Sequence, residues 1–274
     1  LLLSNDVLPA GLGNQHDLVG RYFMEHPHLP GLGEVVVPNI DRLPKVYWRP
    51  QQVDGQSAYA ALVPSEAFLR EKRLLNIQFT LGYRAGYRKG EAPGNPDVGA
   101  KHVDMLAASS QFTGSSRSGN EEWLGAWLVL GCACEQAPNR DSRVMLADKQ
   151  DVLGLRKIRL DWRLTETDRH SVAGHLKNVA MEIGALGMGR MRIDADDLEY
   201  WPPVVRGGSH HMGTTRMHDD PTRGVVDRDC KVHAIDNLYV IGSSVFPTSG
   251  SANPTLTIVA LTLRLADHLK SQGL

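Results

Sequence analysis

The sequence predicts an α/β plus α+β fold, in which an antiparallel sheet with packed helices is followed by a closing βα unit. Three observations support this prediction: segments in which apolar and polar residues alternate, one amphipathic helix, and an apolar strand that leads into an apolar helix near the C-terminus. With 274 residues, 42% hydrophobic and 22% charged, the chain can bury one large core or two modest ones.

Strands with one buried and one wet face are predicted between about residues 34 and 162. Leu75, Ile77, Phe79 and Leu81 alternate with polar residues, and the segment 157–162 repeats the pattern with Ile158, Leu160 and Trp162. Such alternation favours antiparallel pairing. Residues 89–99 and 109–120 are rich in Gly, Pro, Ser and Asn and are predicted to be surface loops, either tolerated insertions or a lid.

A helix is predicted after these strands. Its apolar residues recur at spacings of four and three, and they are Val172, Leu176, Val179, Ile183 and Leu186. Thr165 or Thr167 can cap the start of the helix, and Gly187 can end it. We expect this helix to pack across the sheet.

The C-terminal segment has a different pattern. Residues 237–242 are almost continuously apolar, as expected for a strand covered on both faces, and an apolar helix is expected from Pro254 to about Lys270. Asn253 is a favoured N-cap and Pro254 fits the first helical position, so the first-turn amides would lack partners within the helix. Since ligands of open α/β sheets bind at the carboxyl ends of strands, the loop between Gly242 and Asn253 is a candidate binding site.

Charge and composition exclude several classes of function. Thirty basic and 31 acidic residues give a net charge of -1, which provides no global field to attract nucleic acid or an anionic membrane. The longest apolar run, residues 123–134, is shorter than the roughly 20 residues of a membrane span. Three cysteines, Cys132, Cys134 and Cys230, predict buried thiols in a reducing, cytoplasmic compartment.

Two adjacent histidines, His210 and His211, lie in a glycine-rich stretch that lets the backbone approach a ligand closely. Neighbouring side chains of an extended segment point to opposite sides, so one of the two can face a given ligand. Histidine moves protons near neutral pH. A zinc site is the alternative, but His218 is the one further ligand at close spacing and the pattern matches no metal motif, so no metal is predicted.

These segments closely resemble the C-terminal part of the glucose-methanol-choline (GMC) oxidoreductases. The matching residues are 210–217, 224–227, 237–247 and 253–257 with the terminal helix, about 65 residues in the family's order and spacing. Residues 214–221 are most similar to choline-dehydrogenase-like flavoproteins and pyranose oxidases. Residues 19–27 resemble the family's G-x-N-L-x-D-H stretch, with Tyr22 in place of its asparagine and Glu25 in place of its aspartate.

The resemblance implies an FAD-dependent alcohol dehydrogenase or oxidase that moves hydride from an alcohol or sugar carbon to flavin N5. It places the base at His210 and the partner position at Asn253, whose amide can donate a hydrogen bond to the substrate oxygen. The implied cofactor-binding residues are Gly242, Ser243, Ser244, Ala252, Asn253, Pro254 and Thr255. The substrate and the electron acceptor, whether oxygen, a quinone or a cytochrome, stay open.

The dinucleotide fingerprint G-x-G-x-x-G of these flavoproteins does not occur in the chain. The resemblance therefore implies a C-terminal portion: residues 1–33 as the tail of an FAD-binding Rossmann-like domain, 34–205 as an antiparallel-sheet substrate domain, and 206–274 as the histidine loop and closing βα unit. A missing N-terminal FAD-binding segment is the expected partner, and the chain alone is expected to bind FAD poorly. The alternatives are a non-catalytic, truncated β-rich binding module and a histidine-dependent metal hydrolase.

Overall fold

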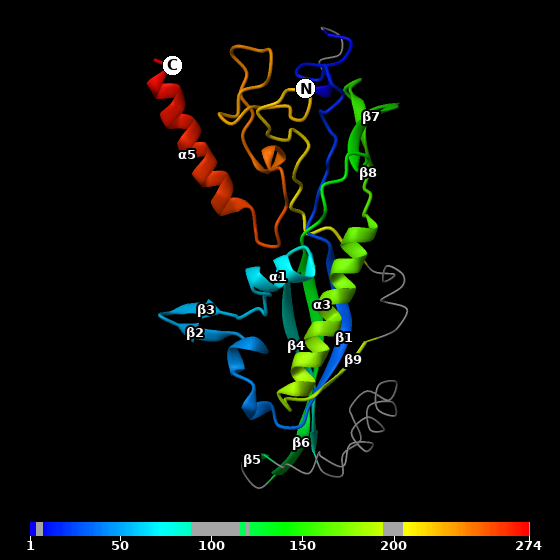
Figure 1. The fold of residues 1–274 in the computed structure, drawn as a ribbon, viewed down its shortest axis with the longest axis vertical. Helices are drawn as coiled ribbons and strands as arrows, with labels where there is room; N and C mark the ends of the chain where they lie inside the picture. The colour runs from blue at the N-terminus through cyan, green and yellow to red at the C-terminus, as the bar shows by residue number, and fades with distance from the viewer. Residues whose placement is uncertain (4–7, 89–115, 119–120, 194–204, 274) are drawn as a thin grey trace. The chain divides into compact units, whose positions relative to one another are not determined.

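The computed structural model describes residues 1–3, 8–88, 116–118, 121–193 and 205–273, which form a mixed α/β structure with antiparallel sheets (Figure 1). Two compact units are present. The first contains residues 1–27, 134–168 and 207–274, and the second contains residues 28–133 and 169–206. The predicted domain bounds of 1–33, 34–205 and 206–274 stay a prediction.

The second unit is built on an antiparallel sheet with the strand order β4-β6-β1-β9. These strands are β4 (Ile77–Arg88), β6 (Glu121–Cys134), β1 (His28–Val37) and β9 (Arg190–Arg192), and β5 (Ser116–Ser118) pairs with β6. The alternation predicted in β4 is confirmed, because Ile77, Phe79 and Leu81 are buried. Of the two predicted loops, residues 89–99 and most of 109–120 lie outside the described residues.

Shorter elements of the second unit precede β4. They are the 3-10 helices η2 (Ile40–Arg42) and η3 (Lys45–Tyr47), the hairpin of β2 (Gln51–Val53) and β3 (Gln56–Ala58), and helix α1 (Glu66–Lys72). Ser65 caps α1 by accepting a hydrogen bond from the Phe68 amide.

The predicted amphipathic helix is confirmed as α3 (Glu166–Ala185). Thr165 directly precedes the first helical residue, whereas Thr167 lies inside the helix. The Asp168 carboxylate accepts hydrogen bonds from the Thr165 amide and hydroxyl at 2.6 and 2.7 Å. Gly187, at φ 60°, ends the helix as predicted. Leu176 is fully buried, and an apolar cavity of about 230 Å³ remains between α3 and the sheet, lined in part by Leu128.

His175 is a buried titratable residue of α3. Its Nε2 atom lies 2.8 Å from the carbonyl oxygen of Leu75, and its ring contacts those of Phe68 and Phe79. Burial lowers the pKa of His175, and the bond to Leu75 offsets this only in part.

In the first unit, β7 (Arg143–Gln150) and β8 (Arg156–Asp161) form a separate antiparallel hairpin. The prediction that Ile158 and Leu160 face a buried core is wrong, since they are 72% and 49% exposed. The alternation of β8 produces a two-faced strand, but residues 157–160 are all exposed, the apolar ones included.

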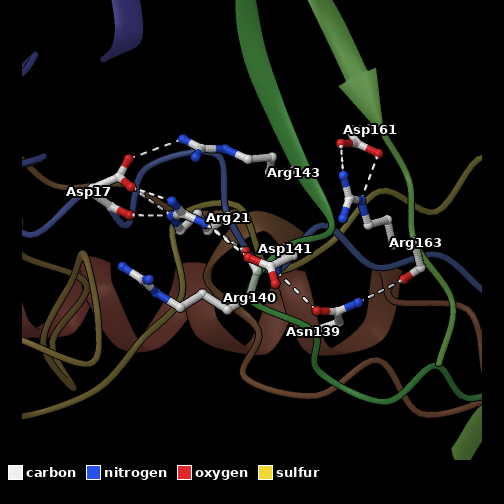
Figure 2. A network of polar contacts seen from close by, with 8 residues as sticks. All are labelled: Asp17, Arg21, Asn139, Arg140, Asp141, Arg143, Asp161 and Arg163. Atoms are coloured by element: carbon white, nitrogen blue, oxygen red, sulfur yellow. Dashed lines mark hydrogen bonds and ion pairs between the residues drawn. The ribbon is translucent and has the colours of Figure 1, made fainter. Parts of the chain in front are cut away.

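Charged side chains fix the base of the hairpin to residues 17–21 (Figure 2). The Asp17 carboxylate pairs with Arg21 and, at 3.0 Å, with Arg143, and Arg21 also contacts Asp141 at 3.4 Å. Burial opposes ionisation of Asp17, but the hydrogen bonds from Arg21 and Arg143 outweigh it and lower its pKa. The network joins segments that are more than 100 residues apart in the chain.

The core of the first unit gathers residues from both ends of the chain. Its buried members are Leu18, Val19, Met24, Met212, Val225, Val226, Val232, Val245 and Phe246. The three cysteines are buried. None of the helices in the described ranges is both long and apolar enough to cross a membrane.

The C-terminal helix is confirmed as α5 (Thr255–Ser271), but two details of the predicted βα unit are wrong. Residues 237–242 form no regular strand: Tyr239 makes an isolated bridge to Lys231, and the run is irregular and only partly buried, because a strand needs a partner along its whole length. Pro254, not Asn253, is the N-cap of α5, and no side chain caps the helix.

Candidate active site

The histidine loop, residues 206–217, is held against residues 22–24 by backbone contacts. Met24 and Met212 form an antiparallel bridge in which each amide donates to the other carbonyl, at 3.0 and 2.9 Å. Both methionines are fully buried. A Cβ atom at Gly213 would lie 2.2 Å from the carbonyl oxygen of Tyr22, so glycine is required for this approach.

His210 lies two residues before this bridge and is partly buried. Its ring meets that of His26 in a T-shaped contact, with centroids 5.1 Å apart. The Nδ1 atom of His210 is buried and has no hydrogen-bond partner in the part of the chain that the structure describes. Because a buried polar atom without a partner is costly, this nitrogen is suited to a ligand.

The carboxylate of Glu25 binds the histidine loop at three points. Its Oε2 atom accepts hydrogen bonds from the Gly208 and His210 amides, both at 3.0 Å, and its Oε1 atom lies 3.0 Å from Nε2 of His211. The Glu25 side chain is 4% exposed, whereas that of His211 is 69% exposed. A Cβ atom at Gly207 would lie 3.1 Å from the Glu25 carboxyl carbon, so this glycine makes room for the carboxylate.

Sequence reasoning missed this role. It treated Glu25 only as a departure from the family's aspartate, although an acidic residue inside the apolar run 22–27 was a signal that a charge is buried there and needs donors.

The loop after residue 241 meets the histidine loop directly. The Gly213 and Thr215 amides donate to the carbonyls of Ser243 and Ser244, at 3.3 and 2.8 Å. The Ser243 hydroxyl also donates to the His211 carbonyl at 2.7 Å. The structure thus brings two groups of predicted site residues together, the histidine pair and the short 3-10 helix η4 (Ser243–Val245).

Gly242 precedes η4 and has a backbone that L residues rarely adopt, with φ 135°. No atom of the described chain lies within 4 Å of the position that a Cβ atom would take there. The backbone at Gly242 is therefore open to close approach by a flat ligand.

Gln136 connects Glu25 with the loop that leads to Asn253, and sequence reasoning missed it as well. The Gln136 side-chain oxygen accepts from the Glu25 amide at 3.0 Å and from the Trp162 indole at 2.9 Å. The backbone amide of Gln136 donates to the Ser249 hydroxyl at 2.9 Å. Gln136 is fully buried, but a single glutamine in an irregular segment gives no sequence signal of such a role.

The remaining predicted site residues lie at the start of α5. Ala252, Asn253 and Thr255 are exposed and Pro254 is buried. Asn253 makes no capping hydrogen bond at the start of α5. Because Asn253 does not cap α5, its amide is available to a ligand.

The histidines provide no metal site within the described ranges, where no three His, Cys, Asp or Glu side chains gather suitably. His218, the third histidine of the zinc alternative, has a local role: its Nδ1 accepts from the Asp220 amide at 2.9 Å, and its carbonyl meets Nε2 of His233.

Comparison with known proteins places residues 138–262 in the GMC oxidoreductase family model. The fructose dehydrogenase large subunit of Gluconobacter japonicus is 27% identical over 98% of this chain and 44% of that protein. The 2-methyl-1,2-propanediol dehydrogenase of Mycolicibacterium austroafricanum is 27% identical over 95% of this chain and 43% of that protein. The chain thus spans less than half the length of these relatives.

Among solved structures, pyridoxine 4-oxidase from Mesorbium loti superimposes with a TM-score of 0.51 at 17% sequence identity. The match covers 98% of this chain and 48% of that structure, and it shows a shared fold.

Proposed function

Because residues 138–262 match the GMC oxidoreductase family model, we propose that the chain is the C-terminal portion of an FAD-dependent enzyme of that family, which oxidises CH–OH groups of alcohols or sugars. The observation that carries the proposal is the buried Nδ1 of His210, which has no partner among the described residues and lies in a loop that is hydrogen-bonded to Ser243 and Ser244. When bound, FAD supplies the acceptor for hydride, and the chain supplies the groups that orient the substrate and take its proton.

His210 is the proposed base. A neutral imidazole with a free ring nitrogen can accept the hydroxyl proton of an alcohol, and such general-base assistance contributes roughly 10²–10⁴-fold to a rate. Asn253 is the proposed partner. Its uncommitted amide can donate a hydrogen bond to the substrate oxygen and align the hydroxyl toward the imidazole.

The residues present suit a flavin. Gly242 with Ser243 and Ser244 would hold the ring at an open stretch of backbone, and Ala252, Asn253, Pro254 and Thr255 would lie at its electron-rich end. Helix α5 has 17 residues and no side-chain cap, so its first amides and the positive end of its dipole remain available to negative charge. In this proposal residues 1–33 and 206–274 complete an FAD-binding Rossmann-like domain, and 34–205 bind substrate.

The decisive test is flavin reduction under anaerobic conditions in the whole protein that contains this chain. We expect a sugar or polyol from a panel to bleach the flavin, and His210→Ala to slow this step by roughly 10²–10⁴-fold with the FAD content unchanged. His16→Ala, which alters an exposed histidine of the same unit, is the control. Equal reduction rates in the His210 and His16 variants would exclude His210 as the base.

A non-catalytic binding module predicts instead that no alcohol reduces the flavin. Reoxidation of the reduced protein by air, a quinone or a cytochrome then identifies the acceptor class. We expect the isolated 274-residue chain to retain little FAD on gel filtration, and stoichiometric retention would contradict this. Three buried cysteines, an odd number, suit a reducing compartment such as the cytoplasm.

A further inference from the structure

We propose that Glu25 is a positioning residue, whose buried carboxylate sets the place of His210 by binding the backbone on either side of Ser209. The effect on catalysis rests on the proposed function, whereas the effect on the loop does not. Nothing in the sequence resemblance assigns this task to Glu25, because the residue there departs from the family pattern.

The local backbone explains how one carboxylate can order this loop. Ser209 has φ 59°, in the left-handed region, and this turns the flanking Gly208 and His210 amides toward the same oxygen of Glu25. Such convergent amides form a nest for an anion. Hydrogen bonds to an ionised acceptor are about twice as strong as neutral ones. Without the carboxylate, the two amides lose their shared acceptor and Ser209 loses the contacts that hold its unfavourable backbone.

The second carboxylate oxygen fixes the neighbouring side chain. Its contact with Nε2 of His211 holds an exposed ring that has no other hydrogen bond in the described structure. The ring also packs at 5.5 Å from that of Phe23. One carboxylate therefore orders the main chain at His210 and the side chain at His211.

Glu25 itself is held in place through its backbone amide. Its backbone amide donates to the side-chain oxygen of Gln136. The backbone amide of Gln136 in turn donates to the Ser249 hydroxyl, in the loop that leads to Asn253. The chain of contacts from Ser249 through Gln136 to Glu25 consists of buried groups. It links the two loops that carry the proposed base and its partner.

Three substitutions test separately the charge of the Glu25 side chain, its length and the space around its carboxylate. Glu25→Gln keeps the shape of the side chain and removes its charge, so the hydrogen bonds from the two amides become neutral ones of about half the strength. Glu25→Asp keeps the charge and shortens the reach by one methylene. Gly207→Ala leaves the carboxylate intact and presses a methyl group to about 3.1–3.3 Å from it. Glu34→Gln is the matched control, because Glu34 pairs with Arg192 at 3.1 Å in the other unit.

The experiment measures amide hydrogen exchange of residues 207–212 and flavin reduction in the FAD-loaded whole protein. We expect Glu25→Gln to speed exchange of the Gly208 and His210 amides at least tenfold. It should slow flavin reduction 10- to 100-fold, with the substrate concentration for half-maximal rate changed less than twofold. Glu25→Asp should recover part of the rate, and Glu34→Gln should change neither quantity.

Unchanged exchange in Glu25→Gln overturns the proposal, and so does faster exchange with an unchanged reduction rate. If Glu25→Gln does not fold, Gly207→Ala decides by the same two readouts. If none of the alcohols tested reduces the flavin of the unaltered protein, the proposed function fails. The exchange measurement still decides whether Glu25 orders the loop.

Discussion

A methyl group added at Gly213 tests whether the histidine loop is packed against residues 22–24 as tightly as the structure has it. Gly213 has φ 87°, and a Cβ atom there would lie 2.2 Å from the Tyr22 carbonyl oxygen and 2.9 Å from the terminal methyl of Met24. The closest ordinary approach of carbon to a carbonyl oxygen is about 3.3 Å. The loop therefore has to move by roughly 1 Å to accept alanine.

The cost has three parts. The left-handed backbone disfavours alanine by about 1–2 kcal/mol. Movement of the loop breaks the two hydrogen bonds of the bridge between Met24 and Met212, each worth about 1 kcal/mol. It also loosens the packing of two fully buried methionines. Together, Gly213→Ala should lower the free energy of unfolding by about 3–5 kcal/mol.

Gly154→Ala supplies the control, measured by urea unfolding followed by circular dichroism. Gly154 has φ 78° in the turn between β7 and β8, and nothing lies within 4 Å of its Cβ position. It should cost only the backbone contribution of about 1–2 kcal/mol. If Gly213→Ala is no more destabilising than Gly154→Ala, the close approach to Tyr22 is refuted.

Three further predictions concern the rest of the protein. Leu128→Ala, which truncates a fully buried side chain of β6, should cost about 2–5 kcal/mol in urea unfolding, and Leu153→Ala, 79% exposed, should cost nearly nothing; equal effects would contradict the described core. Asp17→Asn should lower the free energy of unfolding by about 1 kcal/mol, because the carboxylate is half exposed and solvent screens its pairs with Arg21 and Arg143 (Figure 2). An unchanged urea midpoint would show that the network adds no stability. Burial lowers the pKa of His175 below its usual 6.5, so the unfolded state binds more protons and stability falls as pH drops below 6.5. His175→Gln should flatten this dependence between pH 7.5 and 5, and a slope equal to that of the unaltered protein would contradict the assignment.

Patterns that repeat over a few residues were predicted well. The alternation at Ile77, Phe79 and Leu81 identified β4, and spacings of three and four identified α3. Both signals reflect the geometry of a single element, which fixes the side chains that share a face. The glycine at position 187 ended α3 for the same local reason.

Predictions that depend on a partner elsewhere in the chain were less successful. Ile158 and Leu160 alternate with polar residues just as the apolar residues of β4 do, yet they are exposed. Alternation indicates which face of a strand is apolar, but not whether another layer covers that face. Residues 237–242 are apolar enough for a strand, but pairing decides whether one forms. Asn253 has the right chemistry for a cap, but the helix begins one residue too late for it.

The sequence by itself determined the family resemblance, the elements α3, α5 and β4, and the histidine pair as the place to look for proton transfer. Only the tertiary structure decided what supports that pair: Glu25 lies 185 residues from His210 in the chain, and Gln136 lies 111 residues from Glu25. Local patterns record how one segment presents its side chains. The acceptor that a buried amide finds is set by which distant segments the core brings together, and no spacing in the chain encodes it.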